Sequence, residues 1–379
     1  MLSEPLFGYK VPYQLMTGKK LPGIGTLEQS AALCALMFYH QLVDMLSFLE
    51  RENITREVQS FVVLRDKVPL WKPLSATGLP NPGWRHLGAV LFWRQLFSMI
   101  DPKRVAILAP PGDLAYLTNT TMDNSHEWAF GDMDFHLLEF RNENRDLAGS
   151  PQPLPYGNVL DGSLKDIAAY SRTSVLCSRP WTHLALNEGS FLKSYGTYEY
   201  FERGAPSVIH DITRLLAHYG SPFPNDSLGP QPCMQASMPF VHSFTYTGIF
   251  PFANHANFDK MLPHLEELDC RFAPDPGSGI LDDRQRVGRA ELQDCWQELF
   301  TAYQDICSAL ETGRGAYPRL KKFICGDSRV TGISDDLEHL FTPLCLPEWA
   351  ELKPGEFHRL VSPSSPPEPS HRWTDDENE

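Results

Sequence analysis

The sequence lacks the features that mark membrane-spanning proteins and small metal-binding domains. Its longest apolar run, Ala31 to Tyr39, has nine residues, whereas a helix that crosses a bilayer needs about 20. Prolines and glycines interrupt the first 25 residues, which contain no apolar segment of the secretory signal type. Eight cysteines are present, but no two lie within four residues of each other, so the close spacing of zinc fingers is missing. We expect a cytoplasmic or nuclear protein with no membrane span and with reduced cysteines in its core.

Positive charge is also scarce. Lysine and arginine number 33 against 47 acidic residues, which gives a net charge of −14. Such a chain repels phosphate backbones, and no basic stripe is present, so nucleic acid is not an expected partner. Glycine-rich dinucleotide motifs, phosphate loops and His-Glu-x-x-His helices are absent as well. Ser190 lacks the flanking glycines of a nucleophile elbow. We therefore predict no catalytic residue and no cofactor.

Helices are predicted where apolar residues recur at helical spacing. The clearest covers Leu27 to Arg51, which Thr26 can cap and where Gln29 completes a capping box. The other predicted helices cover Leu87 to Ile100, Pro206 to His218, Asn257 to Leu262 and Ala290 to Leu310.

Short strand-like segments follow these helices and share a loose pattern, with apolar residues at the first, fourth and sixth positions. The best copies are Leu265 to Cys270 and Leu320 to Cys325. Further copies are Val58 to Val63, Arg104 to Leu108, Phe135 to Phe140, Trp181 to Leu186 and Val241 to Tyr246. In leucine-rich repeats this pattern turns apolar side chains inward and polar ones onto a concave sheet face.

The alternation of helices and strands predicts parallel strands joined by crossover helices. We predict an α/β fold, an irregular leucine-rich-repeat-like solenoid with parallel strands and backing helices. Because the copies start at uneven intervals, a globular α/β domain is the alternative. The expected organisation is an irregular N-terminal segment over residues 1–25, the α/β domain over residues 26–355 and a disordered acidic tail over residues 356–379.

Several stretches resemble an uncharacterised fungal family related to F-box and leucine-rich-repeat proteins. They include Trp71 to Trp84, Trp128 to His136, Phe250 to His255 and Leu265 to Asp283, within a region of resemblance from about residue 55 to residue 350. Some members of that family begin with an F-box, which docks on a ubiquitin-ligase adaptor. This chain departs from the family there, because Leu21-Pro22-Gly23-Ile24 is a poor match to an F-box start. The resemblance implies a substrate-reading part, with a ubiquitin-ligase adaptor as a possible partner.

One short motif suggests metal chemistry. Asp132, Asp134 and His136 would face the same side of an extended strand and are suitable ligands for a divalent metal. The competing interpretation is a strand with a solvated polar face and with Met133 and Phe135 buried on the other. The metal interpretation makes a metal-dependent enzyme of unknown type the alternative function.

Two groups of residues suggest protein binding instead. Tyr195, Tyr198, Tyr200 and Arg203 lie in an aromatic and charged stretch, Asn187 to Gly204. Such residues often anchor interfaces, although rings here could also cover the edge of the core. Polar positions between the apolar ones of the strands would contact a partner: Glu266, Glu267, Lys321, Lys322, Thr182 and His183. We predict a non-catalytic protein-interaction module for F-box-like substrate recognition or scaffolding.

Overall fold

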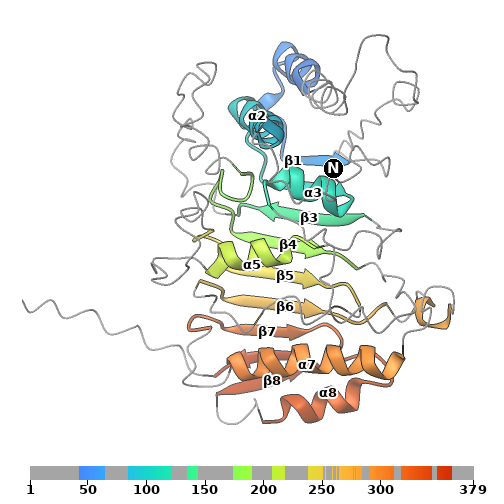
Figure 1. Ribbon diagram of the computed structural model, residues 1–379. Helices are drawn as coiled ribbons and strands as arrows, with labels where there is room; N and C mark the ends of the chain where they lie inside the picture. The colour runs from blue at the N-terminus through green and yellow to red at the C-terminus, as the bar shows by residue number, and fades with distance from the viewer. Residues whose placement is uncertain are drawn as a thin grey trace, which may run out of the picture.

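The fold is a mixed α/β arrangement built on one nine-stranded sheet (Figure 1). The computed structural model describes residues 42–64, 84–120, 135–143, 174–189, 207–217, 238–250, 264–275, 291–310, 317–343 and 348–360, with residues 252, 258, 262, 277 and 279–283. The strands are β1 (Ser60–Leu64), β2 (Arg104–Ala109), β3 (His136–Arg141), β4 (His183–Asn187), β5 (Ser243–Thr247), β6 (Glu267–Arg271), β7 (Lys322–Cys325), β8 (Trp349–Lys353) and β9 (Glu356–Arg359).

The strands follow one another across the sheet in the order β1-β2-β3-β4-β5-β6-β7-β9-β8. Seven of them, β1 to β7, coincide with the seven segments that the sequence predicts, within two residues at each start. The predicted parallel pairing is confirmed between β1 and β2 and from β4 through β7. It is wrong for β3, which runs antiparallel to both of its neighbours, and two strands that the sequence does not predict, β8 and β9, form an antiparallel hairpin beside β7.

Both exceptions have a topological cause. To form a parallel neighbour, the chain must return from the end of one strand to the opposite end of the sheet before the next strand begins. An antiparallel neighbour needs no such crossing. β3 begins opposite the end of β2, where His136 pairs with Ala109. The chain therefore enters β3 at the same end of the sheet at which it leaves β2. β8 and β9 are joined by Pro354 and Gly355, a connection of two residues that allows only a hairpin.

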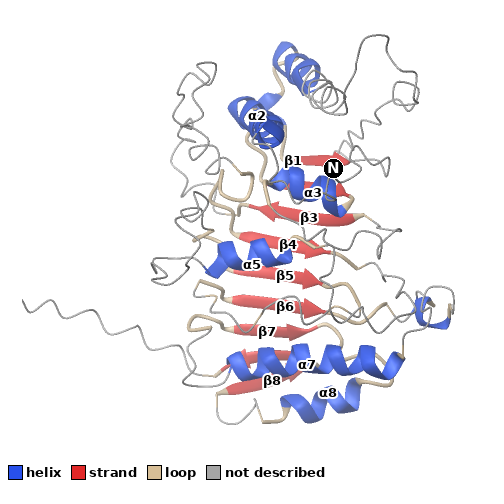
Figure 2. Ribbon diagram, in the orientation of Figure 1, coloured by secondary structure: helices blue, strands red, loops and turns tan. Residues whose placement is uncertain are grey.

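The helices lie on one side of the sheet, except that the first of them lies beyond its β1 edge (Figure 2). They are residues 42–51, α2 (Trp84–Met99), α3 (Pro111–Thr118), α5 (Ile209–Ala217), α7 (Leu292–Leu310) and α8 (Ser334–Phe341), with short 3-10 turns at Thr55–Glu57 and Ile280–Asp282. Three predicted helices are confirmed as α2, α5 and α7. Of the predicted helix Leu27 to Arg51, residues 42–51 are helical and the rest lies outside the described residues. Asn257 to Leu262 also lies outside them, apart from its positions 258 and 262.

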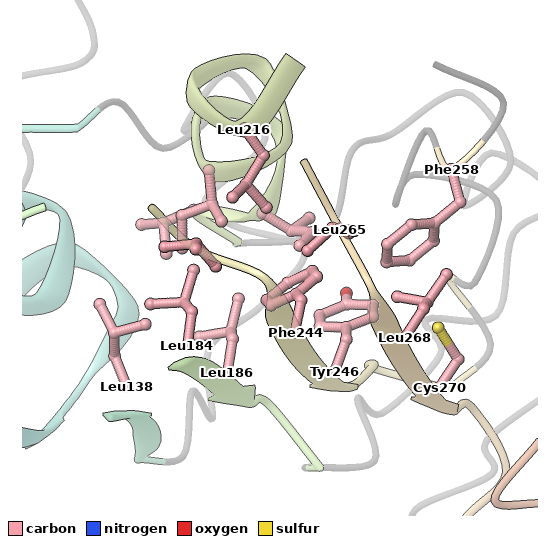
Figure 3. Close-up of a cluster of buried hydrophobic side chains, with 14 of the residues drawn as sticks. Leu138, Leu184, Leu186, Leu216, Phe244, Tyr246, Phe258, Leu265, Leu268 and Cys270 are labelled. Atoms are coloured by element: carbon pink, nitrogen blue, oxygen red, sulfur yellow. The ribbon is translucent and has the colours of Figure 1, made fainter. Parts of the chain in front are cut away.

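The core fills the space between this face and the helices (Figure 3). Alternate strand residues such as Leu184, Phe244 and Leu268 point toward it, and all three are at most 2% exposed. α5 and α7 contribute the stripes that helical spacing predicts, for example Ile212 and Leu299. The cysteines Cys270, Cys295, Cys307 and Cys325 are buried, as expected for small core residues.

The sheet continues past the predicted end of the domain. The sequence predicts the boundary after residue 355, but Glu356–Arg359 form β9 and Phe357 is 2% exposed. The predicted tail therefore starts too early, because a short hairpin with only two buried aromatic residues, Trp349 and Phe357, resembles a polar linker in sequence. Among the described helices, none is long and apolar enough to cross a membrane.

Candidate functional site

Strand residues that alternate with the core residues form the second face of the sheet, here called the open face. Its side chains are Ser60, Val62, Leu64, Arg104, Ala106, Leu108, Leu137, Glu139, Arg141, His183, Ala185, Asn187, Ser243, Thr245, Thr247, Glu267, Asp269, Arg271, Lys322, Ile324, Glu356 and His358. Every described helix places its buried side chains in the core on the opposite side. In the part of the chain that the structure describes, no helix covers the open face (Figure 2).

A charged cluster occupies the open face at β2 and β3. Glu139 accepts a hydrogen bond from Nη2 of Arg104 at 2.6 Å and one from Nε of Arg141 at 2.5 Å. The Glu139 side chain is 9% exposed, whereas that of Arg141 is 56% exposed. Burial by itself would raise the pKa of Glu139, but the hydrogen bonds and charges of the two arginines outweigh it and hold the pKa below its usual value. The two guanidinium groups leave this cluster with a net positive charge.

The middle of the open face, on β4 and β5, is polar but carries little charge. His183 is its only titratable strand residue among those described, beside Ser243, Thr245 and Asn187. The ring of His183 lies edge-on to that of His242, with centroids 4.7 Å apart. Burial lowers the pKa of His183, and the carboxylate of Glu143 opposes that shift.

Opposite charges are interleaved on the strands that follow. Ser243 Oγ donates to Glu267 at 3.3 Å, and Lys322 Nζ lies 3.4 Å from Glu356 Oε1. Hydrogen bonds from His358 and then Lys353 lower the pKa of Glu356 to about 2. Acidic and basic side chains thus alternate across this half of the face, a pattern that favours complementary over indiscriminate contacts.

The structure separates the residues that the sequence predicts for partner binding. Glu267, His183 and Lys322 lie on the open face. Glu266 instead precedes β6, at the end of the sheet where β6 and β7 begin. Its Oε2 lies 2.8 Å from Lys321 Nζ. Thr182 is 4% exposed and so offers little surface to a partner. Tyr195, Tyr198, Tyr200 and Arg203 lie outside the described residues.

The predicted metal ligand His136 lies in the core. It shares the inner face of β3 with Leu138 and Phe140, is 1% exposed, and its Nδ1 is 3.2 Å from Oε1 of Glu188. His136 is therefore not part of a solvated polar face. Asp132 and Asp134 lie outside the described residues, so a joint metal site is not tested. Within the described ranges, no three His, Cys, Asp or Glu side chains are placed to hold a metal ion.

Glu188 lies at the centre of a buried polar cluster that the sequence does not reveal. It is 0% exposed and its carboxylate accepts hydrogen bonds from Ser207 Oγ at 2.6 and 2.8 Å and from Tyr246 OH at 3.0 Å. These groups come from β5 and from the residues before α5, while His136 comes from β3. The cluster therefore links the reversed strand β3 to β5, two strands away, and to the start of α5.

A second buried carboxylate, Asp327, was also missed. Its Oδ2 accepts hydrogen bonds from the backbone N–H of Phe272 at 2.6 Å and of Ala273 at 3.0 Å, and from Tyr303 OH at 2.7 Å. Burial raises the pKa of Asp327, although these hydrogen bonds act against it. The only sequence signal is position, since Glu188 and Asp327 each follow the last core residue of a strand by two.

No family model, curated protein or solved structure matches this chain. The resemblance to fungal F-box and leucine-rich-repeat proteins therefore stays a prediction, together with the adaptor partner that it implies. The site offers a polar sheet face with no described helix over it, together with the buried carboxylates of Glu188 and Asp327 and the donors that bond them.

Proposed function

We propose that this chain is a non-catalytic protein-interaction module that binds a protein partner through the open face. The observation that carries the proposal is the face itself, which presents charged or polar side chains on each strand from β2 to β7 and on β9, with no described helix over it. Exposed polar faces on rigid sheets hold contact residues in fixed positions at little entropic cost.

We further propose that the array is an irregular leucine-rich-repeat-like solenoid. Its support is the sheet order, in which β1 to β7 are neighbours in space as they are in sequence. The run from β4 to β7 is parallel, and α5 and α7 pack behind it. Solenoids of this kind use their sheet face for binding. Substrate recognition for ubiquitin ligation, or scaffolding, is the role that suits such a face in this proposal.

The test is quantitative capture of partners by the tagged full-length chain, with mass spectrometry. The open-face variant combines Arg141→Glu with Glu267→Lys, two exposed positions on β3 and β6. Glu338→Lys on α8 is the control for the Glu267→Lys half, because Glu338 is exposed and its change reverses the same charge away from the open face, and circular dichroism verifies that the open-face variant is folded. A partner recovered with the parent chain and the control, but lost with the open-face variant, supports the proposal. Equal recovery with all three contradicts it.

A second set of variants distinguishes partner binding from local stability at the end of the sheet where β6 and β7 begin. Charge reversal of Glu266 and Glu267 together should weaken capture, but it also breaks the pair between Glu266 and Lys321. The exchange Glu266→Lys with Lys321→Glu restores that pair while it moves both charges. If the exchange also weakens capture, the partner contacts this end of the sheet. If the exchange restores capture, the pair matters only for stability.

The metal-dependent enzyme remains an alternative prediction, since Asp132 and Asp134 are not described. Elemental analysis of the purified protein distinguishes it. Stoichiometric metal that is lost in Asp134→Ala would favour the enzyme. An absence of metal, with thermal stability unchanged by added Mg²⁺ or Mn²⁺, would remove that alternative.

A further inference from the structure

Two arginines lie directly opposite each other on the open face, Arg104 on β2 and Arg141 on β3. Like charges at opposed positions destabilise a sheet, and Glu139 offsets this repulsion by bonding both guanidinium groups. The Glu139 side chain is 9% exposed, whereas those of Arg104 and Arg141 are 36% and 56% exposed. A partner that approaches the cluster therefore meets the guanidinium groups first and the carboxylate beneath them.

Arg141 is held in place but keeps donors for a further acceptor. Its Nε donates to Glu139, and its two Nη atoms bond no other described residue. A guanidinium group already fixed by one carboxylate loses less conformational freedom when it binds a second one. The planar Nη pair matches the two oxygens of a carboxylate in bidentate geometry. Arg141 is thus prepared to receive an acidic group.

A pair of leucines lies further along the same two strands. Leu108 on β2 and Leu137 on β3 are partners in register on the open face, and both are half-buried. Each lies four residues from the arginine on its strand, which places the two pairs about 13 Å apart at the usual rise of a strand. The residues midway, Ala106 and Glu139, are buried. A segment that lies against β2 and β3 therefore contacts the arginines and the leucines together.

Charges around the cluster limit how acidic that segment can be. Two arginines and one glutamate leave a net charge of +1, which one carboxylate neutralises. His183 lies opposite Arg141 in register, and Glu143 Oε2 is 3.7 Å from His183 Nε2, so a second negative charge would meet an exposed carboxylate. The chain as a whole carries a net charge of −14 and repels strongly acidic molecules. A dianionic phosphate or a run of acidic residues therefore suits this position less well than an isolated acidic side chain.

We propose that the partner of the open face presents a protein segment with one isolated Asp or Glu, which pairs with Arg141, and an aliphatic side chain about 13 Å away, which packs on Leu108 and Leu137. This inference rests on the proposed function and names the chemistry of the partner. The spacing corresponds to four residues in an extended segment or to about eight in a helix.

The test is a selection of displayed random peptides by the immobilised full-length protein. Peptides of about 12 residues span both positions in either conformation. The enriched peptides should carry one Asp or Glu at one of these two spacings from Leu, Ile or Val. One enriched peptide is then synthesised, and its dissociation constant is measured by fluorescence anisotropy.

Arg141→Gln should raise that dissociation constant about fivefold or more, because it removes a charge-assisted pair. Arg214→Gln is the matched control and should leave it unchanged. Arg214 is 49% exposed and also pairs with a buried carboxylate, that of Asp211, but it lies on α5 behind the sheet. Circular dichroism verifies that both variants are folded.

A change in the peptide tests the same contact without altering the protein. Replacing the acidic residue of the peptide by its amide should weaken binding to the parent chain as much as Arg141→Gln does. It should weaken binding to Arg141→Gln much less, since the pair is already lost there. Additive losses would show that the acidic residue binds elsewhere, and equal effects of Arg141→Gln and Arg214→Gln would also overturn the inference.

The remaining outcomes separate this inference from the proposed function. Enriched peptides without an acidic residue that no longer bind the combined variant Arg141→Glu with Glu267→Lys would overturn the inference and leave the open face as the binding surface. Peptides that bind this variant as well as the parent chain would contradict both. A selection that enriches no peptide also contradicts the inference, because such a library contains both groups at the required spacing.

Discussion

Glu188 and Asp327 occupy the same place relative to their strands, and each accepts a hydrogen bond from a tyrosine hydroxyl on a neighbouring element. Glu188 follows Leu186 by two residues and contacts Tyr246, while Asp327 follows Cys325 by two and contacts Tyr303. Both carboxylates are 0% exposed. A buried acceptor at the end of a strand satisfies donors that would otherwise be stranded where the chain leaves the sheet. The same arrangement, a buried carboxylate just past a strand that accepts a hydrogen bond from a tyrosine, thus occurs twice in the sheet.

This arrangement predicts that two substitutions of Asp327 lower the free energy of unfolding by different amounts. Asp327→Ala removes the acceptor of three donors, the N–H groups of Phe272 and Ala273 and the hydroxyl of Tyr303. We expect it to lower the free energy of unfolding by about 3 kcal/mol or more, since each stranded donor costs about 1–3 kcal/mol. Asp327→Asn keeps an acceptor oxygen and should cost clearly less. Urea denaturation of both variants measures this, and equal losses would contradict the role given to the oxygen.

Asp327 should also affect how stability depends on pH. Burial raises the pKa of Asp327 above its ordinary value of 3.8, so the folded state binds its proton more tightly than the unfolded state. The resulting stabilisation is complete below the ordinary pKa and is lost as pH rises through the raised one. The difference in unfolding free energy between the parent chain and Asp327→Asn should therefore shift in favour of the variant as pH rises through this range. A difference that does not vary with pH would argue against the raised pKa.

Glu139 predicts the opposite dependence. Its pKa is lowered from 4.5 because Arg104 and Arg141 outweigh the effect of burial. The stabilisation from this carboxylate is present above the ordinary pKa and is lost as pH falls through the lowered one. Glu139→Gln should therefore cost stability at neutral pH and progressively less in acid. Unfolding curves of parent and variant at a series of pH values measure the difference, and Arg141→Met should reduce it.

The cluster around Glu188 makes a prediction about coupling. Tyr246→Phe removes one donor to the Glu188 carboxylate and should cost about 1–2 kcal/mol. Glu188→Ala should cost more, because it leaves the hydroxyls of Ser207 and Tyr246 without this acceptor. The double variant should be less destabilised than the sum of the two single ones, since both disrupt the same bond. Strict additivity in a double-mutant cycle would show that the contact contributes nothing to stability.

Most of the strands could be predicted from sequence because a period of two is a local signal. The apolar positions within Leu265 to Cys270 are enough to predict β6. That prediction requires no information from the rest of the chain. β8 and β9 were missed because the hairpin has few apolar residues, Trp349 and Phe357 being the buried ones. α3 was missed because Pro110, Pro111 and Gly112 are typical of a turn, although proline also suits the first turn of a helix.

The direction of β3 and the buried carboxylates could not be predicted in this way. Strand direction depends on the path of the chain between β2 and β3, which no periodicity encodes. His136 was predicted either to bind a metal or to lie on a solvated polar face, yet it shares the inner face of β3 with Leu138 and Phe140 and lies in the core beside Glu188. Glu188 and Asp327 resemble ordinary turn residues in sequence, because their role depends on donors that lie far away along the chain.

The turn between β8 and β9 allows backbone strain and steric overlap to be measured separately. Gly355 has a φ of +77°, and a Cβ there would lie 2.6 Å from the carbonyl oxygen of Cys325 and overlap Ser328. Gly332 has a φ of +97° but nothing within 4 Å of such a Cβ. Gly332→Ala should therefore cost only the strain of a positive φ, about 1–2 kcal/mol. Gly355→Ala should cost more, because the N–H of Cys325 also bonds the carbonyl of Gly355 at 2.8 Å and this contact would have to shift. Thermal unfolding of both variants checks the order, and a Gly355→Ala that is no worse than Gly332→Ala would mean that the hairpin does not pack against the end of β7 as described.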